Sequence, residues 1–387
     1  MKEIYLDNGA TTKPAESVVR KMAETLTEAY GNPSSLHRKG SQAEAYIIEA
    51  RKIIADYLRV DPTTVTFTSG GTESTNTAIR GAVYKNRRIG KHILTAKGEH
   101  PATSETLKRL ADEGFEIEYV DIDAQGRILP ESLREKVRPD TVLFTCLHVN
   151  NETGMIQPVG ELGRILKEQN PNALFHMDAV QSFAKMPLRP VEWKVDTLSA
   201  SAHKFHGPKG IGCLYIRRGL QITPFINGGG QEKHMRSGTE NVPGIAGMGE
   251  AVRLATTDLA AHEAYVRGLK MALYQGIMQE IPDAAVNGPE PEEGAAHVLN
   301  MRFPGVRSEV LVHSLEDYGI YVSSGSACAS NKPEERSPAL SAIGLSRTEM
   351  DESVRFSFSV MNTPEEMQET VKALAEIVPK LRRYMRR

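Results

Sequence analysis

Cysteine is scarce in this sequence: Cys146, Cys213 and Cys328 are the only three among 387 residues. An odd number of cysteines without close spacing argues against a disulfide framework and is typical of a reducing compartment. The chain also lacks an excess of one charge, because its formal net charge is −2. This balance provides no general attraction to nucleic acid or to an acidic membrane.

Long apolar runs are missing as well. No window approaches the about 20 apolar residues that a membrane-spanning helix needs. The N-terminal MKEIYLDNGATT has charges where a signal peptide has its apolar core. We therefore expect a globular, cytoplasmic protein, and its length favours two domains.

Short apolar segments alternate with helical patterns from residue 52 to residue 213. The predicted strands are Val65–Ser69, His92–Ala96, Phe115–Val120, Thr141–His148, Ala173–Asp178, Val195–Ser201 and Gly212–Ile216. Strands that alternate with helices predict right-handed crossovers. We therefore expect an α/β fold, with a mostly parallel seven-stranded sheet flanked by helices.

A second pattern begins near Asp258 with one long amphipathic helix. It continues with a mixture of strands and helices that predicts a smaller α+β unit. We expect a large domain over residues 14–258 and a small domain formed by residues 1–13 and 259–387. The small domain would carry a cysteine-containing loop at residues 323–338.

Ligands of open α/β sheets bind beyond the carboxyl ends of the strands, so the residues at these ends are the candidates for function. The first strand is followed by GGTESTN, in which Gly71 and Thr72 open a helix. Free N–H groups at a helix start suit a phosphate. The alternative is a simple helix cap by Ser69 or Thr72. No G-x-x-x-x-G-K-[ST] motif is present, which excludes a nucleotide P-loop.

Polar residues follow the next strands too. His100 stands at a predicted helix start, where a lone histidine is more often structural than catalytic. Asn150 and Asn151 follow another strand and suit either a turn or the binding of a substrate carboxylate. Asp178 ends a strand with a buried pattern, and a buried carboxylate needs a partner. It either caps the next helix or keeps a ring nitrogen protonated.

The segment SAHKFHGPKG gives the strongest signal. Lys204 arrives where a strand of small residues ends, and partial burial lowers the pKa of a lysine and makes its amine a nucleophile for carbonyls. His203 and His206 raise the possibility of a metal site, which lacks a third ligand at suitable spacing. A phosphate-binding helix start, a buried aspartate and a reactive lysine together are what pyridoxal phosphate requires.

The sequence resembles the cysteine desulfurases of the NifS/IscS type, within the class V aminotransferase superfamily. The matching segments are YLDNGATT, GNPSSLH, TSGGTES, HVNNETG, DAVQ, SAHKFHGPKGIG, GGGQE, RSGTEN, SSGSACAS and VRFS. They run in order from residue 5 to about residue 360. The resemblance implies the type I fold of pyridoxal-phosphate-dependent transferases.

The resemblance also implies a role for each candidate that holds the cofactor ring. Lys204 would form an imine with the cofactor and move protons at the substrate Cα. His100 would lie over the pyridine ring and assist proton transfer as a catalytic residue. Asp178 would pair with the pyridine nitrogen, and Gln181 would bind the phenolic oxygen. The sequence would then supply a complete set of ring contacts.

Further roles follow for the phosphate and the substrate. The phosphate would be held by Thr72, Ser201 and His203, and by Thr239 of a partner subunit, which implies a homodimer. Asn151 and Arg355 would bind the substrate carboxylate, a task that suits a planar guanidinium.

Cys328 is an exposed-looking thiol among small residues, which by itself is usually incidental. The resemblance implies that it attacks the sulfur of L-cysteine, becomes a persulfide and passes sulfur to an iron–sulfur scaffold or a tRNA thiolation enzyme. A selenocysteine lyase or another class V enzyme is the alternative, and a non-catalytic sulfur carrier is a more distant one. Two departures from the usual motifs are GGTES for GATES and HKFHG for HKFYG, which leaves His206 where tyrosine is common.

Overall fold

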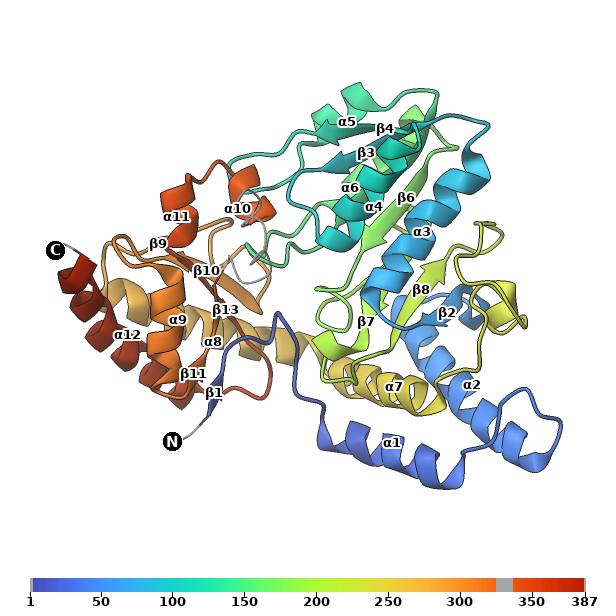
Figure 1. Ribbon diagram of the computed structural model, residues 1–387, viewed down its shortest axis with the longest axis horizontal. Helices are drawn as coiled ribbons and strands as arrows, with labels where there is room; N and C mark the ends of the chain where they lie inside the picture. The colour runs from blue at the N-terminus through green and yellow to red at the C-terminus, as the bar shows by residue number, and fades with distance from the viewer. Residues whose placement is uncertain (1–2, 325–336, 386–387) are drawn as a thin grey trace.

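The computed structural model describes residues 3–324 and 337–385. The chain forms two bodies that lie side by side (Figure 1). One contains the large sheet, and the other contains the C-terminal elements together with the N-terminal strand. The two termini lie on the same side of the molecule, so the first residues pack with the last third of the chain.

The large sheet has seven strands in the order β2-β8-β7-β6-β5-β3-β4. Their bounds are β2 Val65–Thr68, β3 His92–Ala96, β4 Glu116–Val120, β5 Thr141–Leu147, β6 Leu174–Asp178, β7 Thr197–Ser201 and β8 Gly212–Ile216. Only β8 runs antiparallel to its two neighbours. The prediction of a mostly parallel seven-stranded sheet is therefore confirmed.

Three predicted strands start later than expected, and the largest shift, two residues, is in β7. β7 begins at Thr197 instead of Val195, because Asp196 uses its carboxylate to accept the backbone N–H of Phe175, at 2.8 Å, and the ammonium of Lys167, at 2.6 Å. A fully buried carboxylate needs such donors. These contacts hold Asp196 just before β7, outside its regular strand pairing.

Helices cover both faces of the sheet (Figure 1). The helices of this body are α1 Glu16–Glu28, α2 Arg38–Leu58, α3 Gly71–Asn86, α4 Pro101–Asp112, α5 Pro130–Lys136, α6 Val159–Gln169 and α7 Val242–Thr256. Successive strand residues point to opposite faces, so Ile93 packs with α3 and α4 while Leu94 packs with α2, α6 and α7. The strands are buried on both sides, as a parallel sheet requires.

The second body is built on a four-stranded antiparallel sheet in the order β12-β13-β10-β9. Its strands are β9 Ala285–Val286, β10 Val298–Arg302, β12 Ser323–Ser324 and β13 Ser353–Ser357, and its helices are α8 Leu259–Glu280, α9 Ser308–Glu316, α10 Pro338–Ala342, α11 Arg347–Asp351 and α12 Pro364–Met385. β1 (Ile4–Tyr5) pairs in parallel with β11 (Ile320–Tyr321). A separate apolar core joins these elements. We propose that the two bodies are the two expected domains.

None of the helices in the described residues is long and apolar enough to cross a membrane.

Candidate active site

Lys204 lies at the carboxyl edge of the large sheet. β7 ends at Ser201, and one turn of 3-10 helix, Ala202–Lys204, turns the lysine back toward the N-terminal segment. Its ammonium donates to the carbonyl oxygens of Gly9, at 2.7 Å, and Ala10, at 2.8 Å. The side chain is partly buried, as the small residues before it predicted. The two carbonyl acceptors were not predictable from the lysine's own segment.

Asp178 is the last residue of β6, next to β7 in the sheet, and is 2% exposed. Its Oδ1 accepts the backbone N–H of Val180 at 2.9 Å. Burial raises the pKa of the Asp178 carboxyl, while the imidazole of His100 and this N–H act in the opposite direction. A cationic donor would hold the carboxyl ionised, and a protonated ring nitrogen is such a donor.

His100 is the N-cap of α4: its Nδ1 accepts the backbone N–H of Ala102 at 3.1 Å. The structural interpretation of His100 is therefore correct, and it leaves Nε2 free for another partner. The ring is open to solvent on one side. Burial lowers the pKa of His100. The charge of Asp178 raises this pKa, and the charge of Lys204 lowers it. Lys204, Asp178 and His100 thus lie close enough to affect one another electrostatically.

The start of α3 lies beside the end of β7. Gly70 is its N-cap and no side chain caps it, so the predicted cap by Ser69 or Thr72 is wrong. The backbone N–H of Ser69 instead donates to Glu73, at 2.9 Å. The first N–H groups of α3 consequently have no capping oxygen from a side chain. The exposed side chain of Thr72 stands at this helix start.

Gly71 explains the departure GGTES. A Cβ added to Gly71 would lie 2.6 Å from Cγ2 of Val180 and 3.5 Å from Cβ of Ser201. Carbon atoms pack at about 3.5–4.0 Å, so alanine overlaps Val180 here. Gly71, Val180 and Ser201 therefore line one narrow place at the start of α3, which fits the expected position of a phosphate.

Two further predicted cofactor residues are nearby. Nε2 of Gln181 donates to the carbonyl of Gly9 at 3.0 Å, while its buried Oε1 has no partner among the described residues. A hydroxyl donor would satisfy this oxygen. Nδ1 of His203 contacts the hydroxyl of Thr11 at 3.2 Å. Burial, with a further contribution from Lys204, lowers the pKa of His203 to about 4, so its ring is neutral at pH 7.

The predicted carboxylate-binding residues meet at the boundary between the two bodies. Arg355, on β13, donates from Nη1 to the backbone carbonyl of Asn151 at 2.8 Å and from Nη2 to Asp7 at 2.9 Å. Asn151 thus contacts Arg355 through its backbone carbonyl. Asp7 belongs to the motif YLDNGATT, but sequence reasoning assigned it no role. The carboxylate of Asp7 accepts a hydrogen bond from the guanidinium of Arg355, as a substrate carboxylate would.

Asn150 serves the turn that follows β5. Its Oδ1 accepts the backbone N–H groups of Glu152, at 2.9 Å, and Thr153, at 3.0 Å. The turn interpretation therefore holds for Asn150. The same turn positions Glu152, whose carboxylate accepts the hydroxyl of Ser337.

Cys328 lies outside the described residues. The described residues on both sides of its segment reach the site: Ser323, on β12, pairs with Arg355, and Ser337 bonds Glu152. Thr239 is exposed and makes no hydrogen bond with the other described site residues.

His206 makes its hydrogen bonds with the N-terminal segment. It adopts a left-handed backbone conformation, with φ 63°. Its backbone N–H donates to the hydroxyl of Thr12 at 2.7 Å, and its Nδ1 lies 2.9 Å from the carbonyl of Lys13. The ring lines a cavity on the side of α7 and α8. The departure HKFHG therefore places an imidazole in the lining of that cavity, where the usual motif has a tyrosine.

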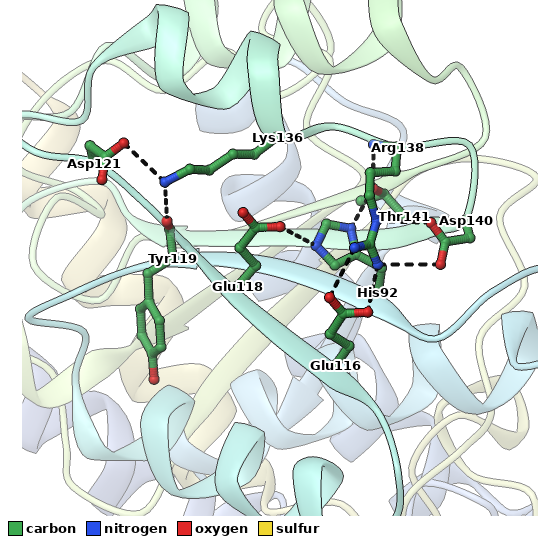
Figure 2. Close-up of polar contacts among 9 residues, drawn as sticks. All are labelled: His92, Glu116, Glu118, Tyr119, Asp121, Lys136, Arg138, Asp140 and Thr141. Atoms are coloured by element: carbon green, nitrogen blue, oxygen red, sulfur yellow. Dashed lines mark hydrogen bonds and ion pairs between the residues drawn. The ribbon is translucent and has the colours of Figure 1, made fainter.

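Among the described residues, one group has the spacing of metal ligands: His92, Glu116 and Glu118, with ligand atoms within 4.8 Å of one another. Figure 2 shows that Arg138 already binds both oxygens of Glu116, at 2.9 and 2.7 Å. Nδ1 of His92 contacts Thr141 at 2.7 Å. The cluster starts β3 and β4, at the end of the sheet away from Lys204, and we interpret it as a structural ion-pair network.

Comparison with known proteins identifies the family. The model of the family "Aminotransferase class-V" matches residues 4–370. The cysteine desulfurase IscS of Methanosarcina thermophila is 42% identical over 381 residues, which cover 98% of this chain and 93% of that protein. A solved structure described as a NifS-like protein has a TM-score of 0.92 and 37% identity, and covers 98% of this chain and 100% of its own.

A second solved structure, described as SspA in complex with cysteine, is 33% identical with a TM-score of 0.80; the match covers 93% of this chain and 100% of that one. The identities far exceed what a shared fold alone requires, and the matches run almost the full length of the chain. The chain therefore belongs to the class V aminotransferase family and, within it, to the cysteine desulfurases of the NifS/IscS type.

Proposed function

We propose that this protein uses pyridoxal phosphate to convert L-cysteine to L-alanine and transfers the sulfur to Cys328. One observation carries the proposal. Lys204, Asp178 and His100 gather at one edge of the large sheet, and the carboxylate-binding Arg355 pairs with the strand that leads to Cys328. A plain aminotransferase would need no reactive thiol for its chemistry.

The residues present fit pyridoxal phosphate. Its hydroxyl would satisfy the buried Oε1 of Gln181, which has no partner among residues 3–324 and 337–385. Its protonated ring nitrogen would supply the cation that the buried Asp178 needs. Its phosphate would bind at the start of α3, with Gly71, Thr72, Ser201 and His203, and with Thr239 of a second copy. When bound, the cofactor withdraws electrons from the substrate and so makes the Cα proton acidic.

The chain's own residues would carry out the rest. Arg355 would bind the substrate carboxylate in place of Asp7, with Asn151 beside it. The amine of Lys204 would attach the cofactor and then move a proton at Cα. His100 has Nδ1 committed to the Ala102 N–H, so Nε2 is the nitrogen that exchanges a proton with the substrate.

The sulfur step needs no external oxidant. The thiolate of Cys328 attacks the sulfur of L-cysteine and forms an S–S bond, while the Cβ–S bond breaks and its electron pair stays with the carbon. A proton then completes the methyl group of L-alanine. Because thiolate is the reactive form, the Cys328 thiol must lose its proton first.

The persulfide implies an acceptor protein, for which we propose an iron–sulfur scaffold or a tRNA thiolation enzyme. The contribution of Thr239 implies a homodimer. We also propose a cytoplasmic location. Cys146 and Cys213 are both buried as free thiols, which agrees with a reducing compartment.

A direct test separates the cofactor from the sulfur chemistry. Protein supplied with pyridoxal phosphate should become yellow, and peptide mapping after borohydride treatment should find the reduced cofactor on Lys204. Cys328→Ala should keep this label and lose sulfide release from L-cysteine, whereas Ser330→Ala, in the same segment, should retain both. A protein that takes up no cofactor, or a Cys328→Ala variant with wild-type sulfide release, would contradict the proposal.

A further inference from the structure

A cavity of about 320 Å³ lies between the two bodies, on the side of α7 and α8. One wall comes from the segment after β6 and from the turn that carries Lys204. The opposite wall comes from α8 and from the residues that follow β13. The cavity exceeds the roughly 150 Å³ that holds a benzene molecule and reaches the lower end of the range for ligand pockets.

The cavity shares only one described residue with the predicted cofactor and substrate contacts. Lys204 is the only one of those residues, among the described ones, that lines it; Asp178, His100 and Arg355 do not. Much of its lining is apolar and includes Met186, Leu254, Leu259, Val266 and Phe358. An apolar space with a few polar groups is the usual composition of a small-molecule site.

Most of the charged groups in the wall already have partners. Glu263 accepts from Arg267 at 2.8 Å, and the same guanidinium also donates to the carbonyl of Glu292 at 2.6 Å. Lys204 donates to two backbone carbonyls. Glu263 is the only carboxylate among the described lining residues. Because it already pairs with Arg267, no described acidic side chain in this wall is without a partner.

Two nitrogen-bearing groups remain without partners. His297 is 6% exposed, and its Nε2 has no hydrogen-bond partner among the described residues. The amine of Lys185 forms no hydrogen bond or ion pair with any residue that the structure describes. A buried nitrogen without a hydrogen-bond partner, as Nε2 of His297 is, is costly, and the side chain of Lys185 is half-buried beside it. Both side chains line the cavity, so a ligand placed there can supply the acceptor.

The electrostatics agree with this arrangement. Burial, then the charges of Lys204 and Arg355, hold the pKa of Lys185 well below its usual range. Burial, then the charge of Lys185, lowers the pKa of His297 in the same way. Each group resists protonation mainly because it is buried, and also because neighbouring cations repel a further positive charge. A negatively charged ligand would offset this repulsion.

We propose that this cavity binds a small organic carboxylate, with its charged group at Lys185 and His297 and its apolar body between α7 and α8. Bare inorganic anions would leave the apolar wall uncovered, and a neutral apolar molecule would leave both nitrogen atoms without an acceptor. The site goes beyond the proposed desulfurase reaction, because the ligand takes no part in the chemistry.

The test uses the full chain loaded with pyridoxal phosphate, and 3-phenylpropanoate as the probe in isothermal titration calorimetry. The carboxylate should bind with one site per chain, and 3-phenylpropan-1-ol and acetate should each bind at least tenfold more weakly. Equal binding of the carboxylate and the alcohol would overturn the proposal, as would no binding of the carboxylate.

Variants locate the site. Lys185→Met removes the amine at similar side-chain length, and Ala255→Phe fills the cavity from α7; each should weaken probe binding at least tenfold. Lys209→Met removes an exposed lysine that does not line the cavity and should change binding less than twofold. Wild-type affinity in both cavity variants would refute the site, and if one variant fails to fold, the other decides. Because the readout is binding, its outcome does not depend on whether the chain releases sulfur from cysteine.

Discussion

Gly71 allows a quantitative test of how the start of α3 is built. In Gly71→Ala the new Cβ would lie 2.6 Å from Cγ2 of Val180, about 1 Å closer than carbon atoms normally pack. Val180 is β-branched and has little rotamer freedom to move away. Overpacking of this kind costs about 1–3 kcal/mol, and alanine recovers up to about 1 kcal/mol of helix propensity. We therefore expect a net loss of about 1 kcal/mol in the free energy of unfolding.

The same substitution should behave differently when Val180 is shortened. In the Val180→Ala background the overlap disappears, so Gly71→Ala should be neutral or stabilising. Urea unfolding of the four proteins in this double-mutant cycle should give a coupling energy of about 2 kcal/mol. Pyridoxal phosphate affinity, measured by absorbance titration, should fall in Gly71→Ala and recover in the double variant. A coupling energy below about 0.5 kcal/mol would refute the steric explanation.

Three other changes test individual residues. Asp178→Asn should lower kcat about 100-fold at saturating cofactor in an alanine-formation assay, because a hydrogen bond to a charged partner is worth up to about 3 kcal/mol; wild-type kcat would contradict the ring-nitrogen role. Arg355→Lys should raise the KM for L-cysteine about tenfold with a smaller change in kcat, because an ammonium cannot make the paired contacts of a guanidinium; an unchanged KM would argue against carboxylate binding. Burial lowers the pKa of His148 to about 4, below the about 6.5 of an unfolded chain, so its contribution to stability is complete above about pH 6.5 and is lost as pH falls toward 4. Urea unfolding should show that the free energy of unfolding falls between pH 6.5 and pH 4, and that this fall is about 3 kcal/mol smaller in His148→Gln. An equal fall in the variant would disprove the assignment.

Much of the sheet and several site residues could be predicted from local sequence, for a simple physical reason. The strands of a doubly covered sheet are buried on both faces, so they read as short apolar runs such as HILTA and VLFTCL. The parallel strands also end at one edge, which brings Lys204 and Asp178 together without any knowledge of the long-range contacts. The antiparallel direction of β8 was not predicted, because the pattern of alternating strands and helices does not show that residues 202–211, between β7 and β8, contain only one turn of 3-10 helix and no crossover helix.

Backbone groups account for most of what the sequence did not reveal. The acceptors of Lys204 are the carbonyls of Gly9 and Ala10, and the acceptor that Asn151 offers to Arg355 is also a carbonyl. Every residue type carries a carbonyl, so no side-chain pattern marks these positions. The predicted cap of α3 failed for a related reason: Ser69 and Thr72 have the right side chains, but the geometry of Gly70 directs them elsewhere.

The N-terminal segment connects the two halves of the site. Gly9 binds Lys204 and Gln181 of the large body, while Asp7, two residues earlier, binds Arg355 of the small one. In the proposed reaction the amine of Lys204 and the guanidinium of Arg355 act on different parts of one small amino acid, so their separation has to be fixed. A stretch of three residues with its own contacts to both bodies fixes it more tightly than packing between the bodies alone. In the proposed reaction the substrate carboxylate and Asp7 compete for the guanidinium of Arg355. Substrate binding there would break the contact of Asp7, while the backbone N–H of Gly9 would still hold the segment to the hydroxyl of Ser357, at 2.7 Å.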